Sequence, residues 1–555
     1  MDKPWLAHYP QGVPSELDEI GYRSLAELLE HAFQTYSDRD ALHFMGAAFT
    51  YGRFGELSRD FAAYCQTLGL KKGDRIALMM PNVPQYPVAI AGAAMAGLTI
   101  VNVNPLYTPG ELAHQLKDSG AKAIVVLENM AATLEACRGQ TDVEHVIVTG
   151  LGDLLPMIKG AIVNFVLRRV KKMVPAYDLP GAVRFKAALS AGAKAKLSKV
   201  AVAPEDIAVL QYTGGTTGVA KGAMLTQRNI VANVIQSAHW NAPALNQLAP
   251  GEQSIVVCAL PIYHIFGFTV NLMLSVRNGG AAILIPNPRD IPATLKAIKA
   301  FRFHSFPAVN TLYNAIALHP DAKSVDWSAL KLCVGGGMAV QAATAERWKK
   351  VTGVSICEGY GLSETSPSAC CNPTDRSEYT GTIGLPLPST ELAILDEDGN
   401  HLPPGSVGEV AIRGPQVMAG YWNRPAETAA VMTADGFFRS GDIGVMSEDG
   451  TFKIVDRKKD MINVSGFNVY PNEVEDVVTR MPGITEAAAI AMSDEASGEA
   501  VKLFVVRSDA AIGEDEIKAY CKANLTGYKR PRVIEFRDEL PKSAVGKVLR
   551  RELRS

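Results

Sequence analysis

Apolar and polar positions between residues 51 and 127 alternate between helical spacing and short buried runs. The spacing predicts helices at Tyr51–Gly69, Ala89–Gly97 and Gly110–Ser119. Short apolar runs predict strands at Arg75–Met80, Thr99–Val103 and Ala121–Leu127. Residues 255–345 repeat this rhythm. Such alternation favours parallel strands joined by right-handed crossovers, with helices on both faces of a sheet.

Near residue 380 the pattern changes to short strands separated by turns. Asp-Gly pairs at 398–399, 435–436 and 449–450 are typical of such turns and indicate β-rich structure. Beyond the charged segment 456–460, two strand patterns and a helix at Glu514–Leu525 predict a small α+β unit. We therefore expect a large N-terminal α/β domain over 1–456, made of parallel-sheet subdomains and a β-rich subdomain. A hinge over 457–460 and a small mobile α+β C-terminal domain over 461–555 complete this prediction.

Composition narrows the function classes. The chain of 555 residues carries 55 Lys and Arg against 57 Asp and Glu, which argues against a nucleic-acid binder. None of the eight cysteines forms a Cys-x-x-Cys pair, so we expect reduced, buried thiols rather than disulfides or a zinc site. The longest apolar stretch, Val88–Val101, is shorter than the roughly 18–20 residues that span a bilayer, and the N-terminal residues lack the apolar core of a signal peptide. These features predict a cytoplasmic protein.

The segment from Tyr212 to Gly222 (YTGGTTGVAKG) is the sharpest chemical signal. Its glycines allow close backbone approach to an anion, while its threonine hydroxyls and Lys221 add donors and charge, so it suits a polyphosphate. The alternative is an ordinary glycine-rich turn. The segment is neither a Walker A loop nor a G-x-G-x-x-G fingerprint. A serine-hydrolase elbow is also disfavoured, because Thr365 replaces the last glycine of that motif.

Several single residues carry a functional and a structural interpretation side by side. Glu364 follows a Gly-Tyr-Gly turn and suits an exposed loop carboxylate that meets a cation, or a solvated surface glutamate. Asp442 and Arg457 suit a ribose, or form a structural ion pair. Lys547 near the C-terminus is a solvated tail residue unless the small domain folds over the site. His264, among apolar neighbours, is a core histidine or the wall of an apolar pocket.

The segment Leu155–Met173 combines an apolar face with a cluster of cations. The apolar face holds Ile158, Ile162, Phe165 and Val166, and the cations are Lys159, Arg168, Arg169, Lys171 and Lys172. A helix of this kind can lie on an anionic membrane surface. A surface helix with a solvated basic face explains the pattern equally well.

Taken together, the motifs resemble those of the adenylate-forming acid–CoA ligases, and in particular the bacterial long-chain fatty acid–CoA ligases. The segments that carry the resemblance occur in that family's order: the loop after Tyr212, residues 360–367, 440–442, 456–459 and 541–547. The run from Asp435 to Lys459 (DGFFRSGDIGVMSEDGTFKIVDRKK) is similar over its whole length to the fatty-acyl-CoA synthetase signature. Similarity covers essentially the whole chain. It departs mildly at residues 437–438, where tryptophan-leucine is common, and at 439–440, where threonine usually precedes the glycine.

The resemblance implies a role for each matching residue. The ATP or AMP site would comprise Thr213, Gly214, Gly215, Thr216, Thr217, Gly218, Val219, Ala220, Lys221, Gly222, Ala223, Met224, Gly336, Gly337, Glu358, Gly359, Tyr360, Gly361, Asp442 and Arg457. The catalytic residues would be Lys547, Glu364 and Thr365, with Thr213 and Glu364 supporting Mg²⁺. The acyl pocket would hold His264, Phe268 and Gly335, and the CoA channel Gly466, Phe467, Lys529 and Arg530, with Lys459 as the pivot.

The reaction implied by the resemblance has two steps. ATP and a fatty acid give an acyl-adenylate and pyrophosphate, and the thiol of coenzyme A then gives acyl-CoA and AMP, which serves β-oxidation or lipid synthesis. Because two anions must meet in the first step, catalysis depends on charge neutralisation and alignment. A ligase for medium-chain or aryl acids, an enzyme that loads a carrier protein, and a non-catalytic fatty-acid-binding relative are the alternatives. A homodimer and peripheral contact with the inner face of the membrane stay open.

Overall fold

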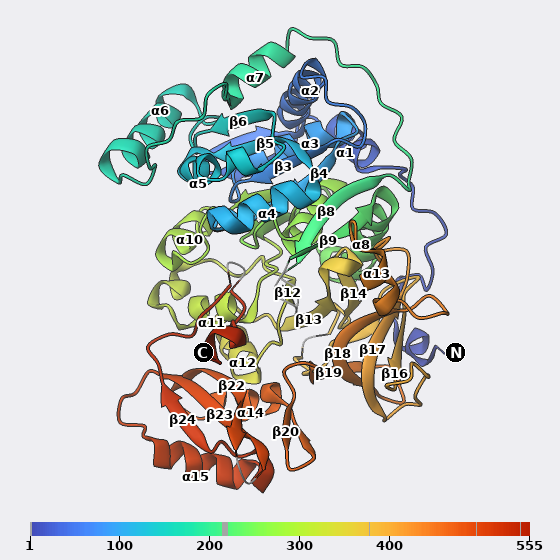
Figure 1. Ribbon diagram of the computed structural model, residues 1–555, viewed down its shortest axis with the longest axis vertical. Helices are drawn as coiled ribbons and strands as arrows, with labels where there is room; N and C mark the ends of the chain where they lie inside the picture. The colour runs from blue at the N-terminus through green and yellow to red at the C-terminus, as the bar shows by residue number, and fades with distance from the viewer. Residues whose placement is uncertain (1–2, 214–219, 377, 495–496, 544–545, 555) are drawn as a thin grey trace.

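A seven-stranded sheet forms the upper layer of the molecule in the computed structural model, which describes residues 3–213, 220–376, 378–494, 497–543 and 546–554 (Figure 1). Its order is β7-β6-β5-β3-β4-β8-β9, and only the β8–β9 pair is antiparallel. The strands are β3 (Arg75–Met79), β4 (Thr99–Asn102), β5 (Ala121–Leu127), β6 (His145–Thr149), β7 (Val183–Arg184), β8 (Ile207–Thr213) and β9 (Lys221–Thr226). The helices along this part of the chain are α2 (Tyr51–Thr67), α3 (Gln85–Met95), α4 (Pro109–Ser119), α5 (Ala131–Glu135), α6 (Met157–Phe165) and α7 (Phe185–Gly192). The predicted parallel α/β architecture is confirmed.

A second α/β layer lies beneath the first. Its four-stranded sheet runs β10-β11-β1-β2, with β1 (Asp40–Phe44), β2 (Ala47–Thr50), β10 (Ile255–Cys258) and β11 (Ala281–Leu284). A further sheet joins β12 (Cys333–Gly335), β13 (Ile356–Gly361), β14 (Ser368–Cys371) and β15 (Leu385–Pro386). The helices here are α1 (Leu25–Thr35), α8 (Gln227–Leu245), the π-helical η5 (Gly267–Met273), α9 (Leu274–Arg277), α10 (Ile291–Ile298), α11 (Asn310–Leu318) and α12 (Ala342–Thr352).

The predicted β-rich subdomain is a four-stranded antiparallel sheet in the order β16-β17-β18-β19. Its strands are β16 (Glu391–Leu395), β17 (Val407–Arg413), β18 (Phe438–Met446) and β19 (Phe452–Arg457), with α13 (Pro425–Val431) beside them. Gly399, Gly436 and Gly450 have φ values of 87°, 85° and 80°, as the Asp-Gly turns require.

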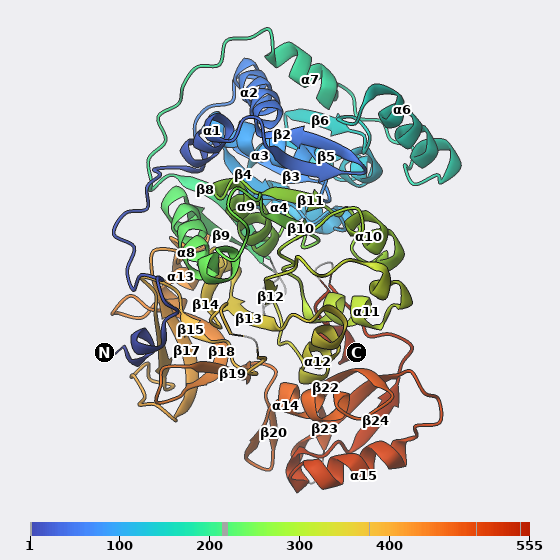
Figure 2. The same cartoon turned by 180° about the vertical axis from the view of Figure 1, so that it is seen from behind.

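The C-terminal part has a sheet and an apolar core of its own (Figure 2). Its sheet contains β20 (Ile462–Val464), β21 (Phe467–Val469), β22 (Ile484–Asp494), β23 (Gly498–Arg507) and β24 (Val533–Phe536). Its helices are α14 (Pro471–Thr479), α15 (Glu514–Asn524) and the short α16 (Arg550–Leu553). The last residues of the chain return from this part toward α11 and α12 of the large part.

Two composition-based expectations can be compared with the fold. All eight cysteines are free and buried, as predicted. Among the described residues, no helix is long and apolar enough to cross a membrane.

Candidate active site

The glycine–threonine segment lies between the two antiparallel edge strands of the large sheet. β8 ends at Thr213, which pairs with Lys221 at the start of β9. Gly214, Gly215, Thr216, Thr217, Gly218 and Val219 lie outside the described residues. The Lys221 ammonium forms an ion pair with Glu427 and lies 5.3 Å from the centroid of the Tyr421 ring. The Glu427 carboxylate and the Tyr421 ring therefore hold the Lys221 ammonium near the C-terminal end of the segment.

Glu364 is buried, which corrects the expectation of an exposed loop carboxylate. Its residue is 8% exposed, and the Tyr421 hydroxyl donates a 2.8 Å hydrogen bond to Oε1. The burial arises because β9 pairs with the chain around Tyr421: Met224 N donates to Gly420 O, and Ala419 N donates to Met224 O. Burial raises the pKa of Glu364.

The surroundings of Glu364 fit a hard cation. The described residues donate no hydrogen bond to its Oε2, so one carboxylate oxygen stays available as a ligand. The turn Ser363–Thr365 contacts β8, the strand that ends at Thr213. Burial disfavours the anionic form of Glu364 more than the charge of Arg457 favours it, and Mg²⁺ would relieve that cost. Carboxylate and hydroxyl are both oxygen ligands of the kind that Mg²⁺ prefers.

The Thr365 side chain faces into its own turn. The residue is fully buried, and its Oγ1 accepts a 2.9 Å hydrogen bond from Leu362 N and also bonds Pro367 O. An α-phosphate contact would require this hydroxyl to exchange partners.

Close packing explains the glycines that follow β12 and line β13. A Cβ on Gly361 would lie 1.8 Å from Pro367 O, and one on Gly335 would lie 2.6 Å from the Val340 side chain. A Cβ on Gly336 would lie 3.0 Å from the Phe266 ring and 3.2 Å from Gly359 O. Gly337, at φ 78°, reverses the chain after the strand. The backbone segments 335–337 and 359–361 can therefore form a flat wall that is almost free of side chains.

Glu358 lies beside that wall and is almost completely buried. Val340 N donates a 3.2 Å hydrogen bond to its Oε1, whereas Oε2 has no partner among the described residues. Burial raises the pKa of Glu358 to about 8. The raised pKa favours the neutral carboxyl at neutral pH, with one of its two oxygens unpaired among the described residues.

Asp442 is the centre of a three-residue cluster. It pairs directly with Arg457 across β18 and β19, and Arg457 Nε lies 3.3 Å from its Oδ1. The Tyr360 hydroxyl donates a 2.7 Å hydrogen bond to Oδ2. Asp442 is 4% exposed, and the fold adds Tyr360 to the Asp442–Arg457 pair that the sequence analysis named.

The loop that carries Lys547 docks onto the large part of the protein. Thr311 Oγ1 donates to Gly546 O at 3.1 Å, and Arg289 donates to Ser543 O at 2.8 Å. Burial and the nearby Arg457 lower the pKa of Lys547 to about 7. Burial and Lys547 in turn lower the pKa of His264 to about 4. The tail lysine is thus partly buried, within electrostatic range of Asp442, Arg457 and His264.

Arg550 is a residue that the sequence analysis missed. Its guanidinium lies 2.9 Å from Glu475, 3.5 Å from Asp460 and 3.9 Å from Asp456, so it ties α16 to the end of β19 and to α14. It follows Lys547 by three positions, and the motif around it gives no sign of which of the two tail arginines is buried.

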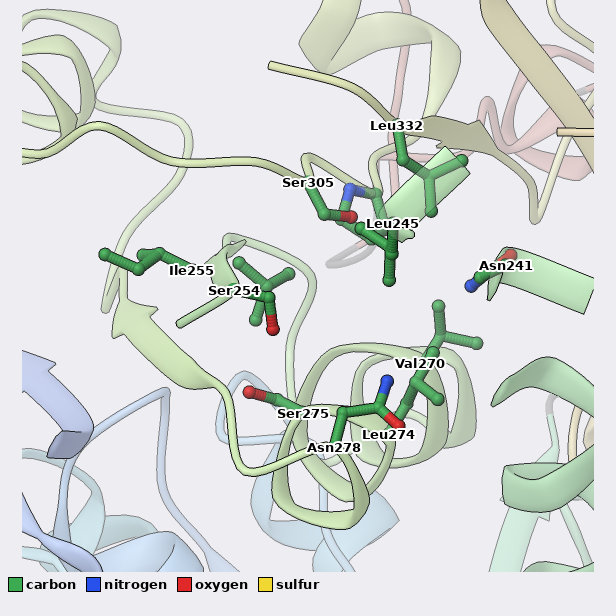
Figure 3. A pocket seen from close by; sticks show the side chains of 12 residues that line it. Asn241, Leu245, Ser254, Ile255, Val270, Leu274, Ser275, Asn278, Ser305 and Leu332 are labelled. Carbon is green, nitrogen blue, oxygen red and sulfur yellow. The ribbon is translucent and has the colours of Figure 1, made fainter. Parts of the chain in front are cut away.

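The residues predicted for the acyl pocket line the start of η5 and the end of β12. His264 is partly buried just before η5, Phe268 on η5 is fully buried, and Gly335 ends β12. Further along η5 and α9, a cavity of about 30 Å³ opens between these helices and α8 (Figure 3). Its walls are Asn241, Leu245, Ser254, Ile255, Val256, Val270, Leu274, Ser275, Asn278, Ser305, Pro307 and Leu332.

The residues predicted for the CoA channel lie apart from this cluster, on the C-terminal part. Gly466 occupies the β20–β21 turn with φ 85°, and Phe467 stacks on Tyr528 with ring centroids 4.8 Å apart. Lys529 forms a 2.7 Å ion pair with Glu473, and Arg530 donates to Leu525 O. Near the other end of this part, the pKa of Lys459 is lowered by burial and by Arg457.

Comparison with known proteins agrees with this geometry. The AMP-binding enzyme family matches residues 29–422, and the C-terminal domain of AMP-binding enzymes matches residues 473–547. The long-chain-fatty-acid–CoA ligase of Salmonella typhimurium is 53% identical over 555 residues, 100% of this chain and 98% of that protein. The Bacillus subtilis enzyme of the same name is 38% identical, covering 99% and 97%. A crystal structure of an anthranilate CoA ligase with anthranoyl-AMP superimposes with a TM-score of 0.84 at 25% identity, covering 96% and 97%. The chain therefore belongs to the AMP-binding enzyme family, and the two relatives named above, 53% and 38% identical to it over nearly their full length, are long-chain-fatty-acid–CoA ligases.

Proposed function

We propose that this protein is an ATP-dependent long-chain fatty acid–CoA ligase. It converts a fatty acid, ATP and coenzyme A into acyl-CoA, AMP and pyrophosphate. The observation that carries the proposal is the docking of Lys547 beside the Asp442–Arg457 pair and His264. The full-length similarity to enzymes named long-chain-fatty-acid–CoA ligase supports the choice of acid.

In the first step, one carboxylate oxygen of the fatty acid attacks the α-phosphorus of ATP, and pyrophosphate leaves. Lys547 bridges the attacking carboxylate and the α-phosphate, so its charge offsets the repulsion between the two anions. Asp442 accepts hydrogen bonds from the ribose hydroxyls, with Arg457 and Tyr360 holding its carboxylate in place. Residues 213–224 hold the β- and γ-phosphates, and Thr365 approaches the α-phosphate.

Glu364 and Thr213 hold Mg²⁺ in this proposal. Bound there, the ion supplies positive charge to the β- and γ-phosphates of ATP. Glu364 is suited to this role because Tyr421 fixes one oxygen and leaves the other to face the ion. The glycine wall and Glu358 lie against the adenine.

In the second step, the sulfur of coenzyme A attacks the acyl carbon, its proton is released, and AMP leaves with the bonding electron pair. We propose that residues 457–460 act as a hinge between domains 1–456 and 461–555, with Lys459 as the pivot. Rotation withdraws Lys547 and brings Gly466, Phe467, Lys529 and Arg530 to the cleft. The Lys547 loop is held by hydrogen bonds from Thr311 and Arg289 to its backbone carbonyls, and such contacts suit a reversible docking.

The acyl chain enters past His264 and Phe268 and follows η5 toward the cavity of Figure 3. That cavity of about 30 Å³ has room for only a few water molecules. A long chain therefore requires the apolar lining side chains, such as Leu245 and Leu274, to change rotamer. Activity on unbranched fatty acids of increasing length would show how long a chain the lining side chains can admit by changing rotamer.

A direct assay tests the function. Purified protein with Mg²⁺, ATP, palmitate and coenzyme A should release AMP and form palmitoyl-CoA, with benzoate and octanoate as competing acids. Failure to release AMP while a validated homologue does so under the same conditions would overturn the proposal. Formation of acyl-adenylate without acyl-CoA would favour an enzyme that loads a carrier protein.

The cellular setting is a separate part of the proposal. We infer a cytoplasmic enzyme that makes peripheral contact with the inner face of the membrane, where long-chain acids partition. A homodimer is also open to test by light scattering of the purified chain. The activity described above requires neither a membrane nor a second subunit.

A further inference from the structure

Exposed apolar side chains are concentrated on one helical segment of the large part. This segment, named here the α6 surface, comprises α6 and the following π-helical turn η4 (Val166–Val170), up to residue 173. Among the described residues, eleven large apolar side chains are exposed, and six belong to the α6 surface: Met157, Ile158, Ile162, Phe165, Val170 and Met173. Their exposed fractions lie between 53% and 82%. Exposed apolar side chains gathered in this way mark an interaction site.

The segment is packed against the protein through its polar side. Gly160, Asn164 and Arg168 follow one another at intervals of four residues and therefore share one face of the helix. Gly160 is buried so closely that an added Cβ would lie 2.3 Å from Gly152 O. Most amphipathic surface helices bury their apolar stripe, so this helix is inverted relative to the rule.

Specific hydrogen bonds fix that inverted orientation. Asn164 Oδ1 accepts from Gly152 N at 2.8 Å, and its Nδ2 donates to Asp153 at 2.9 Å. Arg168 donates to both oxygens of Glu128, a carboxylate that is 1% exposed, at 2.6–3.0 Å. Rotating the helix to bury its apolar side would break these bonds and leave the buried Glu128 carboxylate with Arg184, at 3.3 Å, in place of two arginines.

Cations lie at the C-terminal end of the exposed face. Residues 155–173 contain five Lys or Arg and no acidic residue. Arg168 forms an ion pair with Glu128. Within the described ranges, Arg169, Lys171 and Lys172 form no ion pair with an acidic residue. At the other end, Lys159 bonds to the carbonyl oxygen of Met45, whose side chain is 45% exposed and extends the apolar area.

The segment is remote from the C-terminal part. In both views of the ribbon, α6 lies at the opposite end of the molecule from α15 (Figures 1 and 2). Contact at the α6 surface therefore leaves room for the C-terminal part to move.

We propose that the α6 surface docks on an anionic lipid bilayer. Ile158, Ile162 and Phe165 enter the region between headgroups and acyl chains, while Arg169, Lys171 and Lys172 meet lipid phosphates. A solvated basic face explains the cations but leaves the six exposed apolar side chains unexplained. A bilayer accounts for both, because it offers apolar depth and negative charge together. The proposal identifies a place of contact and rests on the proposed function only for its purpose, delivery of an acid that partitions into lipid.

Flotation with vesicles tests the docking directly. The purified full chain should float with vesicles that contain phosphatidylglycerol and less with pure phosphatidylcholine, and added salt should weaken its binding. The double variant Ile162→Glu/Phe165→Glu should lose flotation. Replacing Arg169, Lys171 and Lys172 together by Gln should lower the partition coefficient about 100-fold, at about fivefold for each cation near an anionic surface.

The control is Val407→Glu, a substitution at a residue that is 52% exposed on β17. It adds one negative charge outside the α6 surface, half the charge that the double variant adds, and should float like the unmodified chain. Flotation that is unchanged in the double variant, or absent from the unmodified chain, would refute the proposal. Dimerisation that the double variant abolishes would instead make the α6 surface a contact between two copies, which also refutes it.

A second measurement separates this inference from the proposed function. AMP release is measured for every variant with the fatty acid dispersed in detergent, where no membrane is needed. The α6 variants should keep activity within about twofold of the unmodified chain, and thermal unfolding should confirm that they are folded. An active chain that does not float refutes the docking alone, whereas a chain that floats without releasing AMP refutes the function alone.

Discussion

Removal of the Lys547 ammonium should separate the two half-reactions. Lys547 lies beside Arg457, Asp442 and His264, and its burial lowers its pKa to about 7. Lys547→Ala deletes the cation and leaves the Asp442–Arg457 pair, which is formed within the β18–β19 sheet, in place. The acid-dependent exchange of pyrophosphate into ATP should therefore fall sharply. Thioester formation from supplied acyl-adenylate should persist.

The magnitude follows from the charge that Lys547 offsets. Loss of one preorganised donor to developing charge typically lowers kcat by about 10²–10³-fold, or about 2.7–4 kcal/mol. A pKa of about 7 in place of the ordinary lysine value of 10.5 means that the substrate-free cleft disfavours the charged lysine by about 5 kcal/mol. Anionic substrates offset this cost, so we expect the full catalytic loss in their presence.

The same pKa predicts a pH dependence. Lysine is charged below its pKa, so the free enzyme with docked Lys547 loses the required proton as pH rises through about 7. The kcat/KM for pyrophosphate exchange should therefore decline above that pH. The residual activity of Lys547→Ala should lack this decline.

Lys542→Ala is the matched control for the lysine assay. Lys542 lies in the same loop, but its ammonium forms a 2.6 Å ion pair with Glu486 on β22. This variant should keep both half-reactions within about twofold, the range of a partly exposed ion pair. Equal loss of both half-reactions in Lys547→Ala, or an equal defect in Lys542→Ala, would refute the assigned role.

Four further changes test other parts of the cleft. Asp442→Asn should weaken ATP binding about 10- to 100-fold, measured by calorimetry, because a charged hydrogen-bond acceptor is lost; unchanged affinity would argue against the ribose contact. Gly466→Asn keeps the left-handed turn at φ 85° but adds bulk, so it should impair thioesterification and spare pyrophosphate exchange; normal thioesterification would exclude Gly466 from the CoA channel. Leu274→Trp should narrow the cavity and lower activity on palmitate more than on octanoate, and an equal effect on both would refute the acyl path. Glu358→Gln should raise the free energy of unfolding of the substrate-free protein in urea by about 3–5 kcal/mol above a pH of about 8, and by little below a pH of about 4.5. The reason is that the raised pKa of Glu358 makes the stability of the unmodified protein fall as pH rises through this window. A difference that does not depend on pH would contradict the buried neutral carboxyl.

The sequence by itself determined the elements and their rhythm, because the signals that form them act over a few residues. The helix predicted at Gly110–Ser119 is an example. Thr108 and Glu111 form a capping box there, and Gly120 closes the helix in the left-handed conformation at φ 60°. The Asp-Gly turns and the change to β-rich structure near residue 380 have the same local origin.

The sequence also indicated which residue types supply the chemistry of the candidate site, but it did not show which of them contact one another. Asp442 and Arg457 are separated by a hairpin, and only the β18–β19 register makes them direct neighbours. Tyr360 reaches them from another sheet. The local sequence does not specify strand register or the position of one sheet relative to another, because both depend on how the buried faces of the strands pack.

Burial was decided by tertiary structure alone. Glu364 has the local sequence of an exposed loop carboxylate, yet pairing of β9 with the chain around Tyr421 encloses it. The α6 surface is the opposite case, because its apolar pattern is that of a buried stripe. There, Glu128 and Asp153 bind the polar face of the helix and turn its apolar side outward. Periodicity marks the two faces of a helix, and the partners supplied by distant segments decide which of them is covered.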